Sequence, residues 1–308
     1  MEKSTLIGLL AIISITAIVA VTAFVGLSSL SDNKQEWHVT YNGLLDYPTP
    51  APEYKLRQIE TSDNSTQYDV IFTSRYAQIA GLLRMPKLNR DEEDLNRIIP
   101  GIVLLPGATV TKEREQGFAK YLCSLGFASI TLDQRNLGSV DMQSDLQMFM
   151  KGIEPTEHKM VHDALAAAVV LRSQPKIDPN RIVYVGESNG GRFAMIACAL
   201  DQNARGVIAI STSGYGIDDA IASGMIRDQR MIQFYRSIDP ETYLSKIAPR
   251  KLVMFHSIND PVIPFESANR TYEKAFQLKN FYSVKCAIHG HCMEMDAFLE
   301  KELTNMDK

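Results

Sequence analysis

The sequence predicts an α/β fold in which helices flank a mostly parallel central sheet, and three observations support this prediction. Short apolar, β-branched runs alternate with longer segments of helical periodicity from residue 54 onward. The run at 99–105 is continuously apolar, as in a strand covered on both faces. A chain of 308 residues with 45% hydrophobic residues is also long enough to bury one large core.

Each predicted element rests on a local pattern. A hairpin-like pair of strands is expected at 68–73 and 79–85, after a strand that begins near Tyr54. An apolar stripe through Val161 and Leu165 indicates an amphipathic helix. The other predicted strands are 99–105, 127–132, 181–185, 207–210, 251–255 and 283–288, and the predicted helices are 116–125, 157–173, 191–200, 265–276 and 293–303.

The alternation of strands and helices lapses at residues 213–248. Charged side chains are mixed there with large apolar ones such as Met231 and Phe234. This mixture predicts a short helical cap insertion over the carboxyl edge of the sheet, where open α/β sheets bind their ligands. An elaborated surface loop explains the composition equally well, so both interpretations stand at this point.

The amino-terminal segment has a different character from the rest. Residues 5–27 carry no charge and are mainly Leu, Ile, Ala and Val, which is long enough for a transmembrane helix. Lys3 before this run favours a cytoplasmic amino terminus. We therefore predict a signal anchor at 1–31 that holds the main domain outside the cytoplasm. Cleavage of a signal peptide near Val21-Thr22-Ala23, with secretion of the domain, is the alternative.

Two further segments complete the predicted domain organisation. Residues 32–53 are polar and then contain three alternating prolines, which favours an extended spacer or an arm along the surface. The main domain is predicted to span 54–308.

Charge and cysteine content exclude several classes of function. A net charge of −4 offers no basic stripe for nucleic acid. The four cysteines include no Cys-x-x-Cys pair and are too few for a disulfide framework. Cys286 and Cys292 are close enough in sequence to bridge in an oxidising compartment, but free thiols are the favoured interpretation.

Residues Gly186-Glu187-Ser188-Asn189-Gly190 fit the Gly-x-Ser-x-Gly nucleophile elbow. The apolar strand at 181–185 precedes the serine, and an alanine-rich helix at 191–200 follows it. Strand, tight turn and helix in this order expose a serine hydroxyl at a helix amino terminus. The motif in this context predicts that Ser188 is a catalytic nucleophile.

A nucleophilic serine needs a base, and the base needs an acid that orients it. In this architecture the acid and then the histidine follow the serine along the chain. Asp260, just after the strand at 251–255, is the predicted acid. His291 is the predicted base, because Gly290 before it lets the loop carry its side chain over the elbow. His289 is then expected to have a supporting role.

The transition state needs two backbone N–H donors, which we predict to be those of Ala108 and Asn189. Asn189 follows the nucleophile at the positive end of a helix, and Ala108 lies in the loop after 99–105. His289 and His291 could instead bind a metal, but no convincing third ligand accompanies them. We therefore assign no metal and no organic cofactor.

Together these motifs resemble the α/β-hydrolase superfamily from about Tyr54 to Leu303, and within it the prolyl oligopeptidase and dienelactone-hydrolase-like branches. The resemblance implies the triad Ser188, Asp260 and His291, with an oxyanion hole at Ala108 and Asn189. It rests on Leu105-Pro106-Gly107-Ala108, Asp133-Gln134-Arg135-Asn136-Leu137-Gly138, Asp163-Ala164, Asp178-Pro179-Asn180-Arg181-Ile182, the elbow, Asp260-Pro261-Val262-Ile263-Pro264 and Gly290-His291.

The chain departs from these relatives in three respects. Many of them have His-Gly where this chain has Pro106-Gly107, and Arg-Gly where it has Arg135-Asn136. The first difference puts the shape of the oxyanion loop in question. No β-propeller precedes the domain in this sequence, which weakens a peptidase assignment.

The predicted function is hydrolysis of carboxylic esters through an acyl-enzyme intermediate. A serine peptidase or amidase of the prolyl oligopeptidase type is the first alternative. A binding module that has kept the fold and lost the chemistry is the second. The expected partners are a small-molecule ester or short peptide and, through the amino-terminal helix, a membrane, but not nucleic acid. The oligomeric state and the identity of the acyl group stay open.

Overall fold

The computed structural model describes residues 37–87 and 98–307. The chain divides into two compact units, 1–38 and 39–308, and the first contributes only Trp37 and His38 to the described part. The predicted signal anchor at 1–31 and the start of the predicted spacer lie outside the described residues. Within the described ranges, no helix is both long and apolar enough to cross a membrane.

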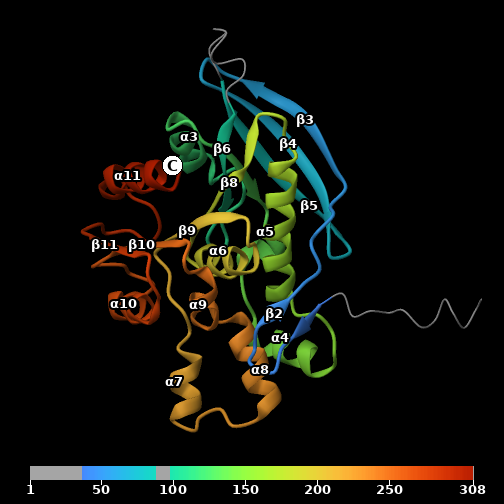
Figure 1. Cartoon of the computed structure of the whole chain (residues 1–308), viewed down its shortest axis with the longest axis vertical. Helices are drawn as coiled ribbons and strands as arrows, with labels where there is room; N and C mark the ends of the chain where they lie inside the picture. Colours follow the sequence, from blue (N-terminus) through green and yellow to red (C-terminus); the bar gives the residue numbers. More distant parts are fainter. Residues whose placement is uncertain (1–36, 88–97, 308) are drawn as a thin grey trace, which may run out of the picture. The chain divides into compact units, whose positions relative to one another are not determined.

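A nine-stranded sheet organises the larger unit, in the order β11-β10-β9-β8-β6-β7-β5-β4-β3 (Figure 1). Neighbouring strands from β11 to β7 run parallel, whereas β5, β4 and β3 form an antiparallel edge beside β7. The predicted mostly parallel sheet is therefore confirmed. The strands are β3 (Tyr54–Thr61), β4 (Ser65–Ser74), β5 (Ala77–Pro86), β6 (Ile99–Leu105), β7 (Ala128–Leu132), β8 (Ile177–Glu187), β9 (Ala204–Ile210), β10 (Lys251–Ser257) and β11 (Lys279–Val284).

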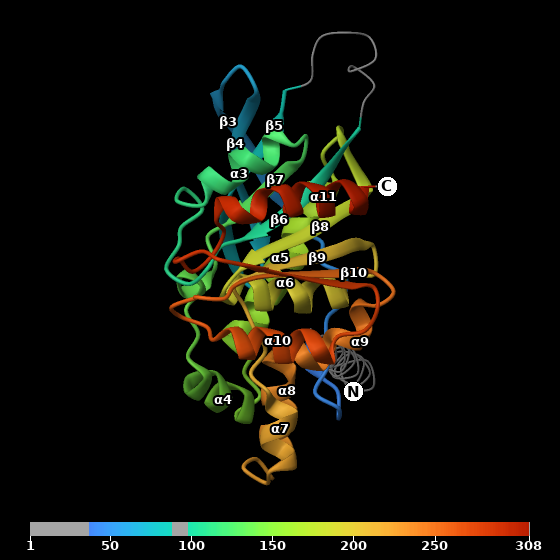
Figure 2. The ribbon, with the colours of Figure 1, turned by 90° about the vertical axis from the view of Figure 1, so that its left-hand side faces the viewer.

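Helices cover both faces of this sheet, as the parallel strands require. Figure 2 shows α3 and α11 on one face and α6 and α10 on the other. Helix α5 contacts β6 and β8, and α6 contacts β8 and β9. The helices are α3 (Gln116–Ser124), α4 (Met142–Met150), α5 (Thr156–Arg172), α6 (Asn189–Leu200), α7 (Ile217–Ala222), α8 (Gln229–Ile238), α9 (Leu244–Ile247), α10 (Phe265–Lys274) and α11 (Asp296–Asp307), with 3-10 turns η1 (Arg135–Gly138), η2 (Pro240–Tyr243) and η3 (Met293–Met295).

The core between the sheet and the α3–α11 layer is built from alternate residues of the central strands. Ile102 and Leu104 of β6 face this layer together with Val183 and Val185 of β8, and all four are buried. Because side chains alternate along a strand, the intervening residues face α5 and α6 instead. The helices complete the cluster with Phe118, Ala119, Leu122, Leu299, Leu303 and Met306.

The last strand differs from the prediction of 283–288. Strand β11 pairs with β10 from Leu252↔Lys279 to Ser257↔Val284 and ends there. Beyond Ser257 the chain of β10 turns away toward Asp260, so residues after Val284 have no strand to pair with. Residues 285–292 form a loop at the carboxyl edge of the sheet, which carries both candidate histidines.

The segment 213–248 is largely helical rather than an irregular loop. It contains α7, α8, η2 and α9. Part of the predicted spacer also packs on the domain, where β1 (His38–Val39) and β2 (Leu45–Asp46) form a two-stranded sheet. Leu45 is buried and donates its backbone N–H to the hydroxyl of Tyr243 at 2.9 Å. The described part of this segment is thus an arm along the surface.

Helix α6 begins against the ends of β6 and β8 at a distance that only glycine permits. A Cβ atom on Gly190 would lie 2.1 Å from the carbonyl oxygen of Leu105. Overpacking of this kind costs about 1–3 kcal/mol, and the obstacle here is rigid backbone. We therefore expect Gly190→Ala to lower Tm by about 3–10 °C.

Gly117→Ala is the matched control for this prediction. Gly117 lies in α3, and a Cβ atom there would meet nothing within 4 Å. Alanine is the better helix former, so Tm should stay the same or rise. Differential scanning calorimetry of both variants tests the prediction, and an unchanged Tm for Gly190→Ala would contradict it.

Candidate active site

Ser188 stands at the sharp turn between β8 and α6. Its backbone has φ 52° and ψ −121°, a conformation that non-glycine residues rarely adopt. The backbone N–H of Ser188 donates to Ile210 at 2.9 Å, and its carbonyl accepts the hydroxyl of Thr212 at 2.7 Å. The strained turn is thus held from β9 and from the segment after it. This is the geometry predicted for a nucleophile elbow.

Two further glycines of the elbow are required by close backbone approach. A Cβ atom on Gly186 would lie 2.3 Å from the carbonyl oxygen of Gly190, and one on Gly191 would lie 2.7 Å from a methyl carbon of Thr212. Such contacts leave no room for a side chain. The elbow glycines therefore fix how closely α6 approaches the sheet.

The loop after β6 lies directly against the elbow. A Cβ atom on Gly107 would be 3.4 Å from Cβ of Ser188, in ordinary van der Waals contact. Ala108 follows in this loop and lies next to Gly138, which the Asn189 side chain contacts through a 3.0 Å hydrogen bond. The structure thus brings Ala108 and Asn189 into one small region around Ser188.

The backbone N–H groups of Ala108 and Asn189 are suited to bind an anion. Asn189 is the first residue of α6, where N–H groups have no acceptor within the helix. Among the described residues, no turn, loop or cap carbonyl accepts a hydrogen bond from the backbone N–H of Ala108 or of Asn189. The neighbouring Pro106, which has no N–H, contributes its carbonyl as the acceptor of the Gln134 side chain.

Asp260 lies in the turn after β10 and its side chain is fully buried. Burial opposes its ionisation, but the backbone N–H groups of Ile263 and Val262, each at 2.9 Å, and the His289 ring hold the pKa of Asp260 below its ordinary value. The carboxylate is therefore charged at neutral pH. This is the state in which an aspartate orients a histidine.

The histidine that contacts Asp260 is His289. Its Nδ1 lies 2.9 Å from both carboxylate oxygens of Asp260. Its Nε2 is buried and has no hydrogen-bond partner among the described residues. His256, also beside Asp260 at 3.8 Å, instead places its Nε2 2.9 Å from the carbonyl oxygen of Ile263. His289 is thus the histidine oriented by the acid.

The prediction that His291 pairs with Asp260 is wrong. The Nε2 of His291 lies 2.7 Å from Asp296, and its ring stacks on Phe118 with centroids 4.2 Å apart. The physical reason is Gly290, whose φ of 99° reverses the chain between the two histidines. His289 therefore faces the acid, and His291 packs against α3.

Several contacts hold the loop that carries His289. The backbone N–H of Gly290 donates to the Ser211 hydroxyl at 3.0 Å, and that of His291 donates to Oε1 of Glu187 at 2.9 Å. A disulfide joins Cys286 to Cys292, so the favoured expectation of free thiols was wrong. The disulfide closes a short ring with His289 at its centre. Bridged sulfur is no longer a thiolate, the form in which cysteine binds metals.

Arg192 forms a polar cluster with Asn189, Ser213 and Tyr215. Arg192 donates to the Asn189 side chain and, at 2.8 Å, to the carbonyl of Ser213. Its guanidinium lies 4.3 Å from the ring centroid of Tyr215. These contacts hold Asn189, whose backbone is a predicted oxyanion donor.

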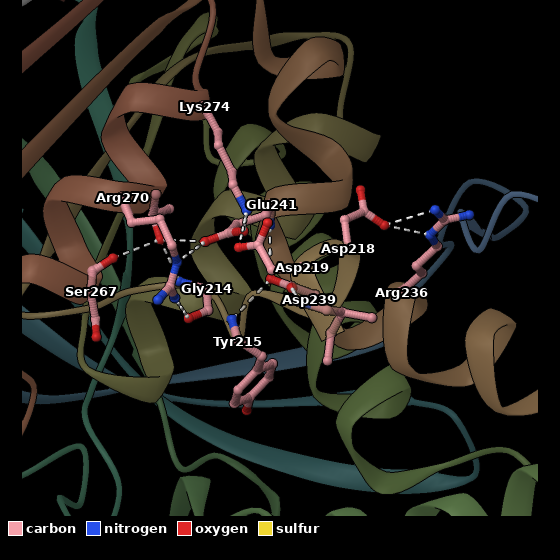
Figure 3. A network of polar contacts seen from close by, with 12 residues as sticks. Gly214, Tyr215, Asp218, Asp219, Arg236, Asp239, Glu241, Ser267, Arg270 and Lys274 are labelled. Atoms are coloured by element: carbon pink, nitrogen blue, oxygen red, sulfur yellow. Dashed lines mark hydrogen bonds and ion pairs between the residues drawn. The ribbon is translucent and has the colours of Figure 1, made fainter. Parts of the chain in front are cut away.

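A network of hydrogen bonds and ion pairs holds the segment that carries Tyr215 (Figure 3). Buried Asp239 accepts the backbone N–H of Tyr215 at 3.1 Å and that of Ile217 at 3.0 Å. Lys274 of α10 lies 2.8 Å from the carboxylates of both Asp219 and Glu241. The helical insertion is therefore tied to α10, the helix that follows the Asp260 turn.

Glu157 is a buried carboxyl group near Arg192 and Tyr215. It is 2% exposed, and neither of its oxygens has a hydrogen-bond partner among the described residues. Burial raises its pKa to about 8, with a smaller contribution from Asp145, while Arg192 acts in the opposite direction. Glu157 is therefore protonated at neutral pH.

The chain matches the model of the Acetyl xylan esterase (AXE1) family over residues 31–259, a range that includes Ser188 and ends one residue before Asp260. The uncharacterized protein YfhR of Escherichia coli O157:H7 is 27% identical over 149 residues, which is 48% of this chain and 50% of YfhR. The chain thus spans about half the length of the curated relatives it matches.

Solved structures show the same fold. An acetyl xylan esterase from Paenibacillus sp. R4 has a TM-score of 0.69 and 15% identity, covering 83% of this chain and 89% of that one. The acylaminoacyl peptidase of Pyrococcus horikoshii has a TM-score of 0.54 and 19% identity, covering 82% of this chain and 40% of that one. These likenesses confirm the α/β-hydrolase fold and the predicted resemblance.

The raised pKa of Glu157 predicts a pH-dependent cost to stability. Between an unfolded pKa of 4.5 and a folded pKa of about 8, only the unfolded chain releases the proton. The free energy of unfolding therefore falls as pH rises through this window. We expect Glu157→Gln to have nearly the wild-type Tm at pH 5 and a Tm several degrees above wild type at pH 8.

Thermal unfolding at pH 5, 6.5 and 8 measures this difference. Glu302→Gln is the matched control, because the pKa of buried Glu302 is lowered: burial opposes ionisation, but Lys251, Tyr282 and Asn280 outweigh it. That variant should not gain stability as pH rises. A Tm difference for Glu157→Gln that does not grow with pH would contradict the prediction.

Proposed function

Because the chain belongs to the Acetyl xylan esterase (AXE1) family of α/β-hydrolases, we propose that it is a serine hydrolase that cleaves carboxylic esters through an acyl-enzyme intermediate. The proposed triad is Ser188, His289 and Asp260. The proposed oxyanion donors are the backbone N–H groups of Ala108 and Asn189. The substrate class is a small-molecule ester.

The observation that carries this proposal is the environment of the His289 ring. One nitrogen is held by an ionised, buried carboxylate, and the other is buried without a partner. A buried polar nitrogen without a partner costs free energy, so it calls for a functional explanation. A general base that receives a proton from a nucleophile explains both halves of this arrangement.

Each proposed residue has a defined step. The Ser188 hydroxyl oxygen attacks the ester carbonyl carbon while Nε2 of His289 accepts its proton. The Asp260 carboxylate stabilises the imidazolium, and the N–H groups of Ala108 and Asn189 bind the oxyanion. His289 then donates the proton to the leaving alcohol oxygen. Water, deprotonated by His289, hydrolyses the acyl ester and restores Ser188.

His289 replaces His291 in this proposal, and the rest of the predicted site is kept. The proposal also retains the signal anchor at 1–31, which would place the domain outside the cytoplasm. The long uncharged run at 5–27 supports the anchor. The Cys286–Cys292 disulfide is consistent with an oxidising compartment.

Covalent labelling tests the proposed nucleophile. A fluorophosphonate probe should label the wild-type protein covalently, because the probe captures an activated serine. Ser188→Ala should abolish labelling and lower kcat on p-nitrophenyl acetate by about 10⁴-fold or more. In-gel fluorescence and initial rates measure the two effects. Labelling retained in Ser188→Ala would assign the nucleophile elsewhere.

Substitution of each histidine in turn tests which of the two is the base. His289→Asn should lower kcat by about 10⁴-fold or more, because the base is lost. His291→Asn should keep kcat within about tenfold, since the His291 ring contacts Asp296 and Phe118 rather than Asp260 and asparagine keeps the backbone N–H. Both variants should be folded by circular dichroism. The reverse order of activities would restore His291 as the base.

Paired ester and amide substrates test the alternative of amide hydrolysis. We expect acetyl and short acyl p-nitrophenyl esters to be turned over, and aminoacyl p-nitroanilides to react at least about 100-fold more slowly in kcat/KM. Comparable rates on both substrates would favour the peptidase. Folded protein without labelling or turnover would favour a binding module.

A further inference from the structure

Glu187 is the last residue of β8 and directly precedes Ser188, and its carboxylate contacts the loop of the proposed base. Oε1 accepts the backbone N–H of His291 at 2.9 Å. Oε2 lies 3.0 Å from the position that a Cβ atom on Gly290 would occupy. One side chain therefore touches two consecutive residues after His289.

The surroundings of Glu187 make a carboxyl group costly there. Burial raises its pKa above the ordinary value, against the hydrogen bond from His291 and the nearby histidines. Glu115 lies close by, 5% exposed, with Oε1 lacking a partner among the described residues. Burial, and secondarily the Glu187 carboxylate, raises the pKa of Glu115 to about 8. Two carboxyl groups in one buried region disfavour each other's ionisation.

The other described anchors hold the loop to different elements. Ser211, which binds Gly290, follows β9, and Asp296, which binds the His291 ring, begins α11. The Cys286–Cys292 disulfide closes the loop on itself. Glu187 differs from these anchors because the next residue in the chain is the proposed nucleophile.

We propose that Glu187 is a positioning residue that sets the distance between nucleophile and base, by accepting the His291 N–H from a backbone continuous with Ser188. This inference rests on the proposed function. A displacement of about 1 Å in a catalytic group lowers turnover by about 100-fold. The contact should therefore control kcat more than substrate binding.

Three substitutions separate the hydrogen bond from charge and from packing. Glu187→Gln keeps an oxygen acceptor at the same reach and removes the charge. Glu187→Asp keeps the charge but withdraws the acceptor by one methylene. Glu187→Leu keeps the approximate volume without any acceptor. Glu302→Gln again serves as the control, since it alters a buried carboxylate in α11 away from this loop.

Steady-state kinetics on p-nitrophenyl acetate and fluorophosphonate labelling rates are measured for all variants, with Tm recorded in parallel. We expect kcat of Glu187→Gln within about threefold of wild type, and that of Glu187→Asp and Glu187→Leu lower by about 10- to 100-fold. KM should stay within about threefold in every case. Glu302→Gln should keep wild-type kcat whatever its Tm.

Two results would overturn the inference. Wild-type kcat in Glu187→Asp together with loss in Glu187→Gln would show that charge matters and the hydrogen bond does not. Wild-type kcat in both Glu187→Asp and Glu187→Leu would show that neither matters. Should Glu187→Leu fail to fold, the comparison of kcat between Glu187→Gln and Glu187→Asp decides. Failure of the proposed function is distinct, because the wild type itself would then show neither labelling nor turnover.

Discussion

The close packing of α6 against the ends of β6 and β8 is the constraint on which the site depends. Backbone atoms of Gly190 approach the carbonyl of Leu105 so closely that no Cβ atom fits. Because the helix starts this near the sheet, the chain must turn at Ser188 within one residue, and the serine takes a left-handed φ. The loop of Gly107 and Ala108 then lies beside the serine. The proposed nucleophile and the proposed oxyanion donors are thus brought together by one backbone contact.

Two buried carboxyl groups, Asp260 and Glu157, differ in ionisation because they differ in hydrogen-bond donors. Asp260 receives two backbone N–H groups and a histidine, and its pKa is lowered although burial opposes this. Glu157 receives no donor from the described residues, and burial raises its pKa to about 8. The same chemical group is therefore charged in one place and neutral in the other. The charged one lies where the proposed mechanism needs to stabilise an imidazolium.

Local sequence patterns predicted the parts of the molecule that local physics determines. The elbow glycines and Ser188 form a short motif within a strand–turn–helix context, so their arrangement followed from the residues alone. The carboxyl end of β11 did not follow from the local residues, because it depends on where β10 leaves the sheet at Ser257. The helical insertion is tied to α10 through the ion pairs of Lys274 with Asp219 and Glu241, which no local pattern could indicate.

The choice of His289 as the proposed base rests on its contact with Asp260. A glycine between two histidines shows that the chain turns there, but it does not show which histidine faces the acid. Gly290 has a φ of 99°, and His289 before it contacts Asp260 whereas His291 after it contacts Asp296. A signal was available in the cysteines, since Cys286 and Cys292 flank His289 at equal sequence distance and close a ring around it. Disulfide-bonded flanks would have favoured the central histidine.

The left-handed backbone at Ser188 has an evolutionary consequence. A residue with a side chain in such a conformation costs about 1–3 kcal/mol, and glycine would relieve most of it. Selection for heat resistance alone would therefore drift toward glycine at this position and abandon the hydroxyl. With Ser188 as the proposed nucleophile, selection for turnover would retain serine here against its cost in stability, a trade-off that laboratory evolution could expose by relaxing one pressure at a time.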